Sequence, residues 1–178
     1  MIYMFLANGF EEIEALLPLD LMRRAGLDVT TVGVGGKDIT GSHGITVKAD
    51  MLDSDFSDNA PECVILPGGM PGTTNLDASA VVHKALDSAL ENNSLICAIC
   101  AAPMILGKRG ILCGKNATCF PGFEKYLEGA NVGGRVVRDG NVITGIGMGA
   151  ALEFGIEIVA TLKSREEADK LAAAVLAK

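Results

Sequence analysis

The sequence is organised around the stretch LICAICAAP at residues 95–103, which joins a strand pattern to a sharp turn. Residues 95–99 form a short apolar run of strand length, and residues 101–108 continue at once with a helical pattern. Cys100 lies at the junction, where the small residues Ala98, Ala101 and Ala102 leave room for a tight turn. A nucleophile at such a junction has the elbow geometry of hydrolase-like sheets. The stretch predicts a strand that leads directly into a helix, with Cys100 at the turn.

The same alternation of strand and helix patterns runs through the whole chain. Apolar runs predict strands at 2–6, 28–34, 45–48, 63–66, 95–99 and 117–119, and a hairpin at 135–138 and 141–144. Amphipathic stretches predict helices at 11–25, 78–91, 101–108, 122–128, 149–162 and 165–177. Strands that alternate with helices form a mostly parallel sheet with helices on both faces. We therefore predict an α/β fold, in one domain over residues 1–178.

The composition excludes several classes of protein. The chain has 178 residues and is 49% apolar, but no apolar run approaches the roughly 20 residues of a membrane span. Residues 1–6 lack the basic flank and cleavage site of a secretory signal and are interpreted as a first strand. The net charge is −7 and only 4% of residues are aromatic, so a nucleic-acid partner is not expected. Five cysteines without a signal sequence indicate free thiols in a reducing cytoplasm.

Cys100 is the leading candidate for a reactive side chain. In a parallel sheet, functional groups lie on loops at the carboxyl ends of strands, here residues 7–9, 67–69 and 99–101. The positive end of the following helix is expected to favour the Cys100 thiolate. The backbone N–H groups of Gly69 and Ala101 are expected to form an oxyanion hole beside it. The competing interpretation, an inert buried cysteine, is not excluded by position alone.

Glu14 is the candidate for acid–base chemistry. A carboxyl group beside a cysteine can act as general acid or base when burial raises its pKa. Glu11, Glu12 and Glu14 all lie at the start of the first predicted helix, where carboxylates are favoured. The alternative is therefore that all three are solvated residues of the helix start.

The other cysteines give weaker hypotheses. Cys97 and Cys100 match the C-x-x-C pattern, but Cys97 lies within a predicted strand and a redox dithiol is disfavoured. A zinc site of Cys97, Cys100, Cys113 and Cys119 is disfavoured by its spacing. Cys63 and Cys119 are expected in the strand core, and no metal is expected.

The two histidines and the glycine-rich segments do not complete a site. His83 is expected to be solvated on a helix face, and His43 lies in a turn. A Cys–His dyad requires only spatial proximity, so the sequence does not exclude one. Residues 33–36 and 145–149 lack a full dinucleotide or phosphate-loop pattern, and no cofactor is expected.

Three motifs in order resemble the ThiJ/PfpI family, and within it the subgroup of the Parkinson-disease-associated protein deglycase. They are residues 7–14, 66–69 and 98–103, with further similarity at 23–26, 35–38 and 152–159. The resemblance implies a flavodoxin-like three-layer α/β/α sandwich with a mostly parallel central sheet, in a homodimer. It also implies that Cys100 is the nucleophile, that Glu14 bonds to its sulfur, and that Gly69 and Ala101 form the oxyanion hole.

Departures from the family pattern narrow the activity. Ala101 stands where the protease branch has histidine, so peptidase activity is not expected. Phe120 stands where many subgroup members have histidine, which removes a proton shuttle. His43 stands where relatives often have an arginine that reaches the partner subunit's site.

The sequence and the resemblance together predict a cysteine-dependent, stress-protective enzyme in the cytoplasm. Its expected partners are small α-oxoaldehydes or glycated proteins, as for a glutathione-independent glyoxalase or deglycase. Cys100 attacks the aldehyde, Glu14 moves a proton between two substrate carbons, and water gives the hydroxy acid. The alternatives are a redox sensor or chaperone in which Cys100 is oxidised, and an amidotransferase-like hydrolase, which requires a well-placed histidine.

Overall fold

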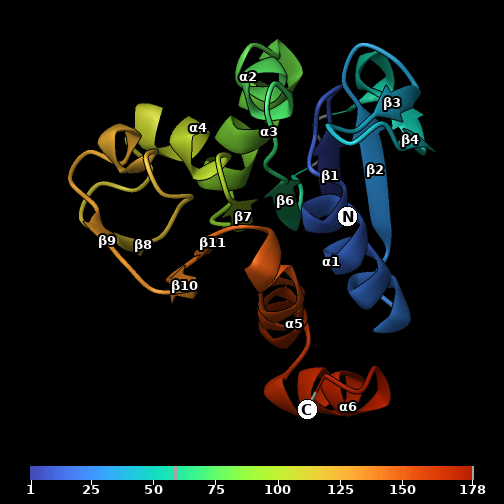
Figure 1. Cartoon of the computed structure of the whole chain (residues 1–178), viewed down its shortest axis with the longest axis vertical. Helices are drawn as coiled ribbons and strands as arrows, with labels where there is room; N and C mark the ends of the chain where they lie inside the picture. The colour runs from blue at the N-terminus through green and yellow to red at the C-terminus, as the bar shows by residue number, and fades with distance from the viewer. Residues whose placement is uncertain (58–59, 178) are drawn as a thin grey trace.

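The fold is centred on a seven-stranded sheet, seen in a computed structural model that describes residues 1–57 and 60–177 (Figure 1). In spatial order the strands of this described sheet are β10 (Val136–Asp139), β11 (Val142–Gly145), β7 (Leu95–Ile99), β6 (Cys63–Leu66), β1 (Ile2–Leu6), β2 (Val29–Gly33) and β5 (Met51–Leu52). All neighbouring strands are parallel except β10 and β11, which form the predicted hairpin. Strands β1, β6 and β7 are buried at every position, as expected of a parallel sheet covered on both faces.

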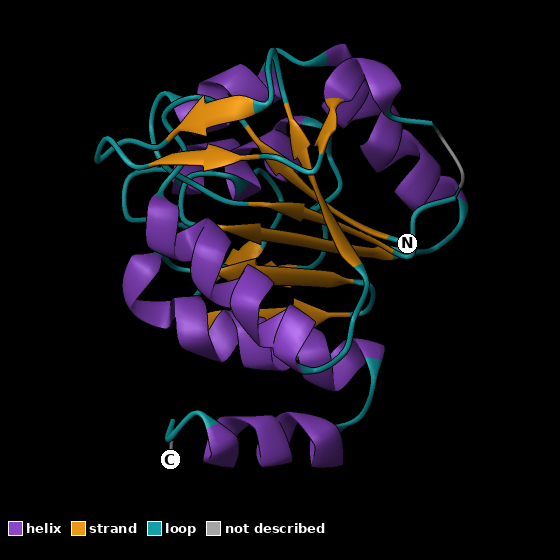
Figure 2. Ribbon diagram, turned by 90° about the vertical axis from the view of Figure 1, so that its right-hand side faces the viewer, coloured by secondary structure: helices purple, strands orange, loops and turns teal. Residues whose placement is uncertain are grey.

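Helices cover both faces of this sheet (Figure 2). One face packs against α1 (Glu12–Arg24) and α5 (Ala151–Leu162), and α6 (Arg165–Ala174) packs against α5. The other packs against α3 (Ala80–Glu91) and α4 (Pro103–Lys108), with α2 (Gly72–Asp77) joined to the same cluster through Leu76. The period-2 pattern divides β1 between the two cores, with Met4 on the first face and Phe5 on the second. The predicted flavodoxin-like three-layer α/β/α sandwich is therefore confirmed.

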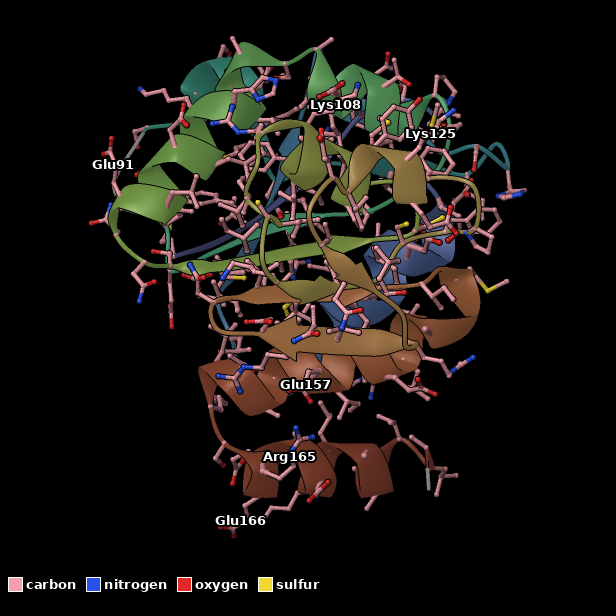
Figure 3. The ribbon with its side chains drawn as sticks, turned by 90° about the vertical axis from the view of Figure 1, so that its left-hand side faces the viewer. Glu91, Lys108, Lys125, Glu157, Arg165 and Glu166 are labelled. Atoms are coloured by element: carbon pink, nitrogen blue, oxygen red, sulfur yellow. The ribbon has the colours of Figure 1, made fainter. Side chains whose placement is uncertain are left out.

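Helix α6 forms the C-terminal edge of the first helical layer. Its N-terminus is capped by Ser164, whose hydroxyl accepts a hydrogen bond from the Glu167 amide. Arg165 extends from α6 to Glu157 on α5 (Figure 3). Leu171 and Ala168 pack into the core, so both apolar and charged contacts attach α6 to α5.

Several predicted elements are corrected by the structure. The segment expected to be a helix at 122–128 contains only a 3-10 turn, Glu124–Tyr126. The strand expected at 117–119 is β8 (Asn116–Ala117), which pairs with β9 (Asn131–Val132), a strand that the sequence does not predict. The strand expected at 45–48 is β4 (Thr46–Lys48), and its partner β3 (Asp38–Thr40) was not predicted. Helix α2 was missed as well, and the helix expected at 78–91 begins only after Ser79 caps α3. Short elements carry little periodicity, which explains these misses.

None of the helices in the described residues is long and apolar enough to cross a membrane.

Candidate active site

Four loops converge at the carboxyl end of the sheet. Strands β11, β7, β6 and β1 are consecutive neighbours and parallel, so the loops that follow them meet at one edge. They carry Met148, Cys100, Gly69 and, at the start of α1, Glu14. The topology therefore brings together the predicted site residues Cys100, Glu14, Gly69 and Ala101 from three separate segments of the chain.

Cys100 occupies a strained elbow at the end of β7. Its φ is +64°, in the left-handed region that non-glycine residues seldom adopt. Its backbone N–H donates to the Gly145 carbonyl at 2.8 Å, and its own carbonyl accepts from the Phe120 N–H at 2.8 Å. These two bonds fix the turn from both sides, and the side chain remains partly exposed.

The sulfur of Cys100 is surrounded by three polar groups. The backbone N–H groups of Gly69 and Ala101 donate to it, and the Glu14 side chain forms a hydrogen bond with it. Gly69 has a φ of +89°, and a Cβ there would lie 2.3 Å from the Glu11 nitrogen. The close approach of the 67–69 loop to this segment therefore requires glycine.

Glu14 is buried rather than solvated, so the interpretation of a solvated helix-start acid is wrong for this residue. Its side chain is only 1% exposed, and Oε2 accepts the Gly68 N–H at 3.1 Å. The Met148 N–H also donates to this carboxyl group. Burial raises the pKa of Glu14 to about 7, despite these bonds and the bond with Cys100.

The expectation that the helix N-terminus stabilises a thiolate is not met. Helix α4 begins only at Pro103, after a turn, and has six residues. Burial, followed by the negative charge of Glu14, raises the pKa of Cys100 to about 12, although the Gly69 and Ala101 N–H groups lower it. Glu14 therefore loses its proton near pH 7 and the Cys100 thiol keeps its proton to about pH 12, so the pair carries one proton between these pH values.

Gly68 is a site residue that sequence analysis missed, although the Gly-Gly pair at 68–69 signalled a close approach. A Cβ at Gly68 would lie 2.4 Å from Glu14 Oε2 and 2.6 Å from Cys100 Cβ.

We expect Gly68→Ala to separate Glu14 from Cys100 and to reduce Cys100 alkylation by iodoacetamide at least about tenfold, by analogy with other misplacements of reacting groups. Gly36→Ala is the matched control, because nothing lies within 4 Å of a Cβ there. Equal alkylation rates in both variants would show that the contact is not critical.

The other cysteines form neither of the disfavoured sites. Cys97 points into the buried core on β7, where its sulfur lies 3.8 Å from that of Cys63. Cys113 is exposed, and Cys119 is buried in a loop rather than in the expected strand. Within the described residues these sulfurs do not gather into a group of potential metal ligands.

Both histidines are engaged away from Cys100. His43 Nδ1 lies 2.9 Å from Glu12 Oε2, and the His43 amide donates to the same carboxylate. The expectation that His83 is solvated is wrong, because both of its ring nitrogens have protein partners. Its Nε2 bonds to the Asp77 carbonyl at 2.7 Å, and its Nδ1 lies 2.8 Å from an Arg109 nitrogen. These contacts give Cys100 no histidine partner within the described residues of one chain.

Glu12 is a second buried acid that the sequence did not single out. It is 2% exposed and binds the turn between β3 and β4 through the amides of His43 and Ile45. Hydrogen bonds from the turn hold the pKa of Glu12 below its ordinary value in spite of burial. With Glu11 and His43 it forms a group that could ligate a metal, but its oxygens are already used by the turn. We therefore assign Glu12 a structural role.

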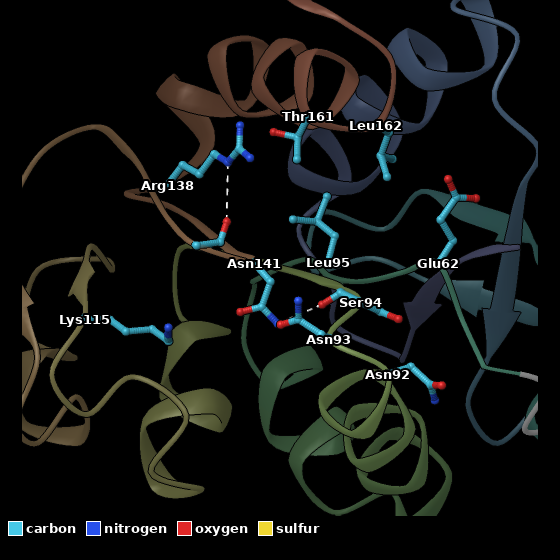
Figure 4. Close-up of a pocket in the computed structure, with 11 residues that line it drawn as sticks. Glu62, Asn92, Asn93, Ser94, Leu95, Lys115, Arg138, Asn141, Thr161 and Leu162 are labelled. Carbon is cyan, nitrogen blue, oxygen red and sulfur yellow. Dashed lines mark hydrogen bonds between the residues drawn. The ribbon is translucent and has the colours of Figure 1, made fainter.

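A hollow of about 700 Å³ lies at the opposite end of the sheet (Figure 4). It is lined by Ser94 and Leu95 at the start of β7 and by Asn141 before β11. Asn141 donates to the Ser94 carbonyl across it at 3.0 Å. Since Cys100 follows the other end of β7, this hollow is separate from the cysteine site.

A profile of the DJ-1/PfpI family matches residues 1–161. The chain belongs to this family. The Parkinson disease protein 7 homolog of Danio rerio is 38% identical, over 97% of this chain and 95% of its own. The glutathione-independent glyoxalase DJR-1.2 of Caenorhabditis elegans is 31% identical, over 90% of this chain and 87% of its own. The oxidised DJ-1 of Toxoplasma gondii has a similar structure, with a TM-score of 0.94 and 34% identity over 98% of this chain and 97% of its own. These relatives support a stress-protective function of the DJ-1 type.

Proposed function

We propose that this DJ-1/PfpI protein converts α-oxoaldehydes, or their adducts with protein amines and thiols, into hydroxy acids without glutathione. The observation that carries the proposal is the Cys100 sulfur bonded to the buried Glu14 carboxyl and to the N–H groups of Gly69 and Ala101. The Caenorhabditis elegans relative is named a glutathione-independent glyoxalase, which supports this proposal. Action on the adducts with protein amines and thiols would be a deglycase activity, and we include it in the proposal.

The first step is the addition of sulfur to the aldehyde carbon. Between about pH 7 and pH 12 the one proton of the pair lies on the Cys100 sulfur, and the Glu14 carboxylate takes it as the sulfur attacks. The new C–S bond converts the carbonyl into an alkoxide beside the sulfur, within reach of the Gly69 and Ala101 N–H groups. Glu14 then gives its proton to this oxygen, and the product is a neutral hemithioacetal with a free carboxylate beside it.

The second step moves a proton between the two substrate carbons. The Glu14 carboxylate takes the proton from the carbon bound to sulfur and returns it to the neighbouring carbonyl carbon through an enediol. The hydroxyl proton on the first carbon passes to the oxygen of the second carbon, and the hemithioacetal becomes a thioester of the hydroxy acid. Water then cleaves the C–S bond, which releases the hydroxy acid and restores the Cys100 thiol. Oxidation at one carbon balances reduction at the other.

The direct test is to supply methylglyoxal in glutathione-free buffer and to assay lactate. Steady formation of lactate supports the proposal. Loss of methylglyoxal without any lactate contradicts it, because simple trapping by thiols or amines produces no hydroxy acid.

The pH dependence of turnover follows from the one proton of the pair. The reactive pair carries one proton, so it forms as pH rises through about 7 and is lost toward about pH 12. We expect kcat/KM for methylglyoxal, measured by lactate formation from pH 5 to 10, to rise about tenfold per unit below pH 7 and then to level off. In Glu14→Gln this rise should move away from pH 7. An unchanged profile in that variant would contradict the coupling.

A second candidate function is redox sensing at the same cysteine. The partly exposed Cys100 sulfur, with two N–H donors, is placed to hold a sulfinate, and Glu14 in its protonated form could donate a third bond. Intact mass after mild peroxide distinguishes the two functions. A gain of two oxygens confined to Cys100, without aldehyde turnover, favours the sensor.

We also propose a homodimer in a reducing cytoplasm. Ile13 and Ile45 are exposed apolar residues beside the turn that Glu12 holds, and five free thiols suit a reducing compartment. Sedimentation equilibrium of the purified chain tests the dimer.

A further inference from the structure

Three large apolar side chains remain exposed where the loops meet around Cys100. Met70 is 49% exposed, Phe120 47% and Met148 54%. They belong to three different loops, yet each is attached to the backbone that holds the Cys100–Glu14 pair. Met70 follows Gly69, which donates to the sulfur, and the Met148 N–H donates to Glu14. The Phe120 N–H donates to the Cys100 carbonyl at 2.8 Å.

The Phe120 ring and the Glu14 carboxyl group both lie close to Gly147. A Cβ at Gly147 would lie 3.3 Å from Phe120 Cδ2 and 3.9 Å from Glu14 Oε1. The ring and the carboxyl group therefore border the same point in space. The absence of a side chain at Gly147 keeps that point open between them.

The resulting site has a polar interior and an apolar rim, which we define as Met70, Phe120 and Met148. Its interior offers a thiol, a carboxyl group and N–H donors to a reacting carbonyl. Exposed apolar residues scattered singly over a surface need no explanation, whereas three on the loops that hold one reactive sulfur do, although the Met70 sulfur also accepts a hydrogen bond from Thr74 on α2 at 3.9 Å. Methionine and phenylalanine provide adaptable and flat apolar surfaces for an aliphatic or aromatic group.

We propose that the apolar rim binds the substituent of the substrate, and that the site prefers α-oxoaldehydes with aryl or extended alkyl groups over glyoxal. This inference rests on the proposed function, and it names the substrate class for the same site. Loss of the Phe120 ring removes apolar contact from the substituent but leaves the reacting groups in place. A tenfold preference corresponds to about 1.4 kcal/mol, within the range for burial of part of an aromatic ring.

The first experiment compares kcat/KM for phenylglyoxal and glyoxal in three proteins: the native chain, Phe120→Ala and Leu90→Ala. Leu90 is a matched control, because it is 40% exposed on α3, outside the loops that form the site. We expect the native chain to prefer phenylglyoxal by about tenfold or more after correction for intrinsic aldehyde reactivity. Phe120→Ala should lose most of that preference, and Leu90→Ala should keep both rates within about twofold of the native chain.

The second experiment tests the apolar rim without any turnover. Iodoacetanilide and iodoacetamide both alkylate a thiol, but only the first carries a phenyl group. The ratio of their rates at Cys100, divided by the same ratio for glutathione, should exceed about five in the native chain and fall toward one in Phe120→Ala. Mass spectrometry assigns the alkylated cysteine.

The outcomes separate failure of the rim from failure of the proposed function. Aldehyde turnover with no aryl preference in either experiment overturns the rim and leaves the proposed function intact. Aryl preference in alkylation without aldehyde turnover supports the rim and contradicts the proposed function. If Phe120→Ala changes the oligomeric state in sedimentation, the rim is an interface between copies of the chain and this proposal is wrong.

Discussion

Replacing Cys100 by serine is expected to reduce lactate formation from methylglyoxal by at least about a thousandfold, as for loss of other enzymatic nucleophiles. A serine hydroxyl ionises far less readily than a thiol, and the Glu14 carboxylate would no longer generate a nucleophilic anion by taking its proton. Serine is nearly isosteric with cysteine and the Cys100 side chain is partly exposed, so the fold should be retained. The assay is lactate release by the native and variant chains at equal concentration.

Cys113→Ser is the control for this experiment. Cys113 is exposed and follows α4, away from the loops that form the site, so its variant should keep the native rate. A Cys100→Ser protein that still produced lactate within about tenfold of the native rate would exclude covalent catalysis at this residue.

Glu14→Gln is expected to lower turnover by about 10²–10⁴-fold, the usual contribution of a general acid–base group. Glutamine keeps the size of the side chain but cannot carry a proton between substrate carbons. Glu12→Gln is the matched control, because Glu12 is equally buried on the same helix but binds the turn at 41–45 instead of Cys100. A similar loss of turnover in both variants would indicate general damage to α1.

The same Glu14→Gln change should stabilise the folded protein at alkaline pH. Burial raises the folded pKa of Glu14 from its ordinary 4.5 to about 7, so the folded state binds this proton more tightly than the unfolded state. Stability from this group is complete below pH 4.5 and is lost as pH rises through 7. The loss amounts to at most about 3 kcal/mol.

Urea unfolding at pH 5 and pH 8 measures this linkage. The native chain should lose stability between the two values, and Glu14→Gln should lose less. A variant that is less active but more stable at pH 8 cannot be explained by partial unfolding.

The sequence was most informative where the determinants are local. The alternation of strand and helix patterns predicted the sandwich, because long strands such as β1 and β7 are fully apolar. Cys100 and Ala101 follow β7 directly, so their place at a turn was evident. Glu14 and Gly69 come from other loops, and their proximity to Cys100 depends on the order of strands, which local patterns do not encode. Their loop positions make both of them candidates, and the family resemblance implies their contacts with Cys100.

The predictions that fail concern side chains whose surroundings are formed by residues distant in the sequence. Glu12 and Glu14 looked like solvated acids of a helix start, but the 41–45 turn covers one and the 67–69 loop covers the other. The expected thiolate depended on a helix N-terminus directly after Cys100, whereas α4 starts three residues later and Glu14 contributes an opposing charge. His83 was assigned to solvent because Arg109, 26 residues away, could not be placed beside it.

The most direct test of the account is to identify the covalent intermediate. The native chain and Glu14→Gln are mixed with methylglyoxal, quenched in acid after a few milliseconds to seconds, and digested with trypsin. The peptide of residues 85–108 contains both Cys97 and Cys100, so fragmentation must locate the added mass. The account predicts a hydroxylamine-sensitive lactoyl thioester on Cys100 in the native chain and its absence in Glu14→Gln. Lactate formation with no thioester on Cys100, or with the label on another residue, would contradict it.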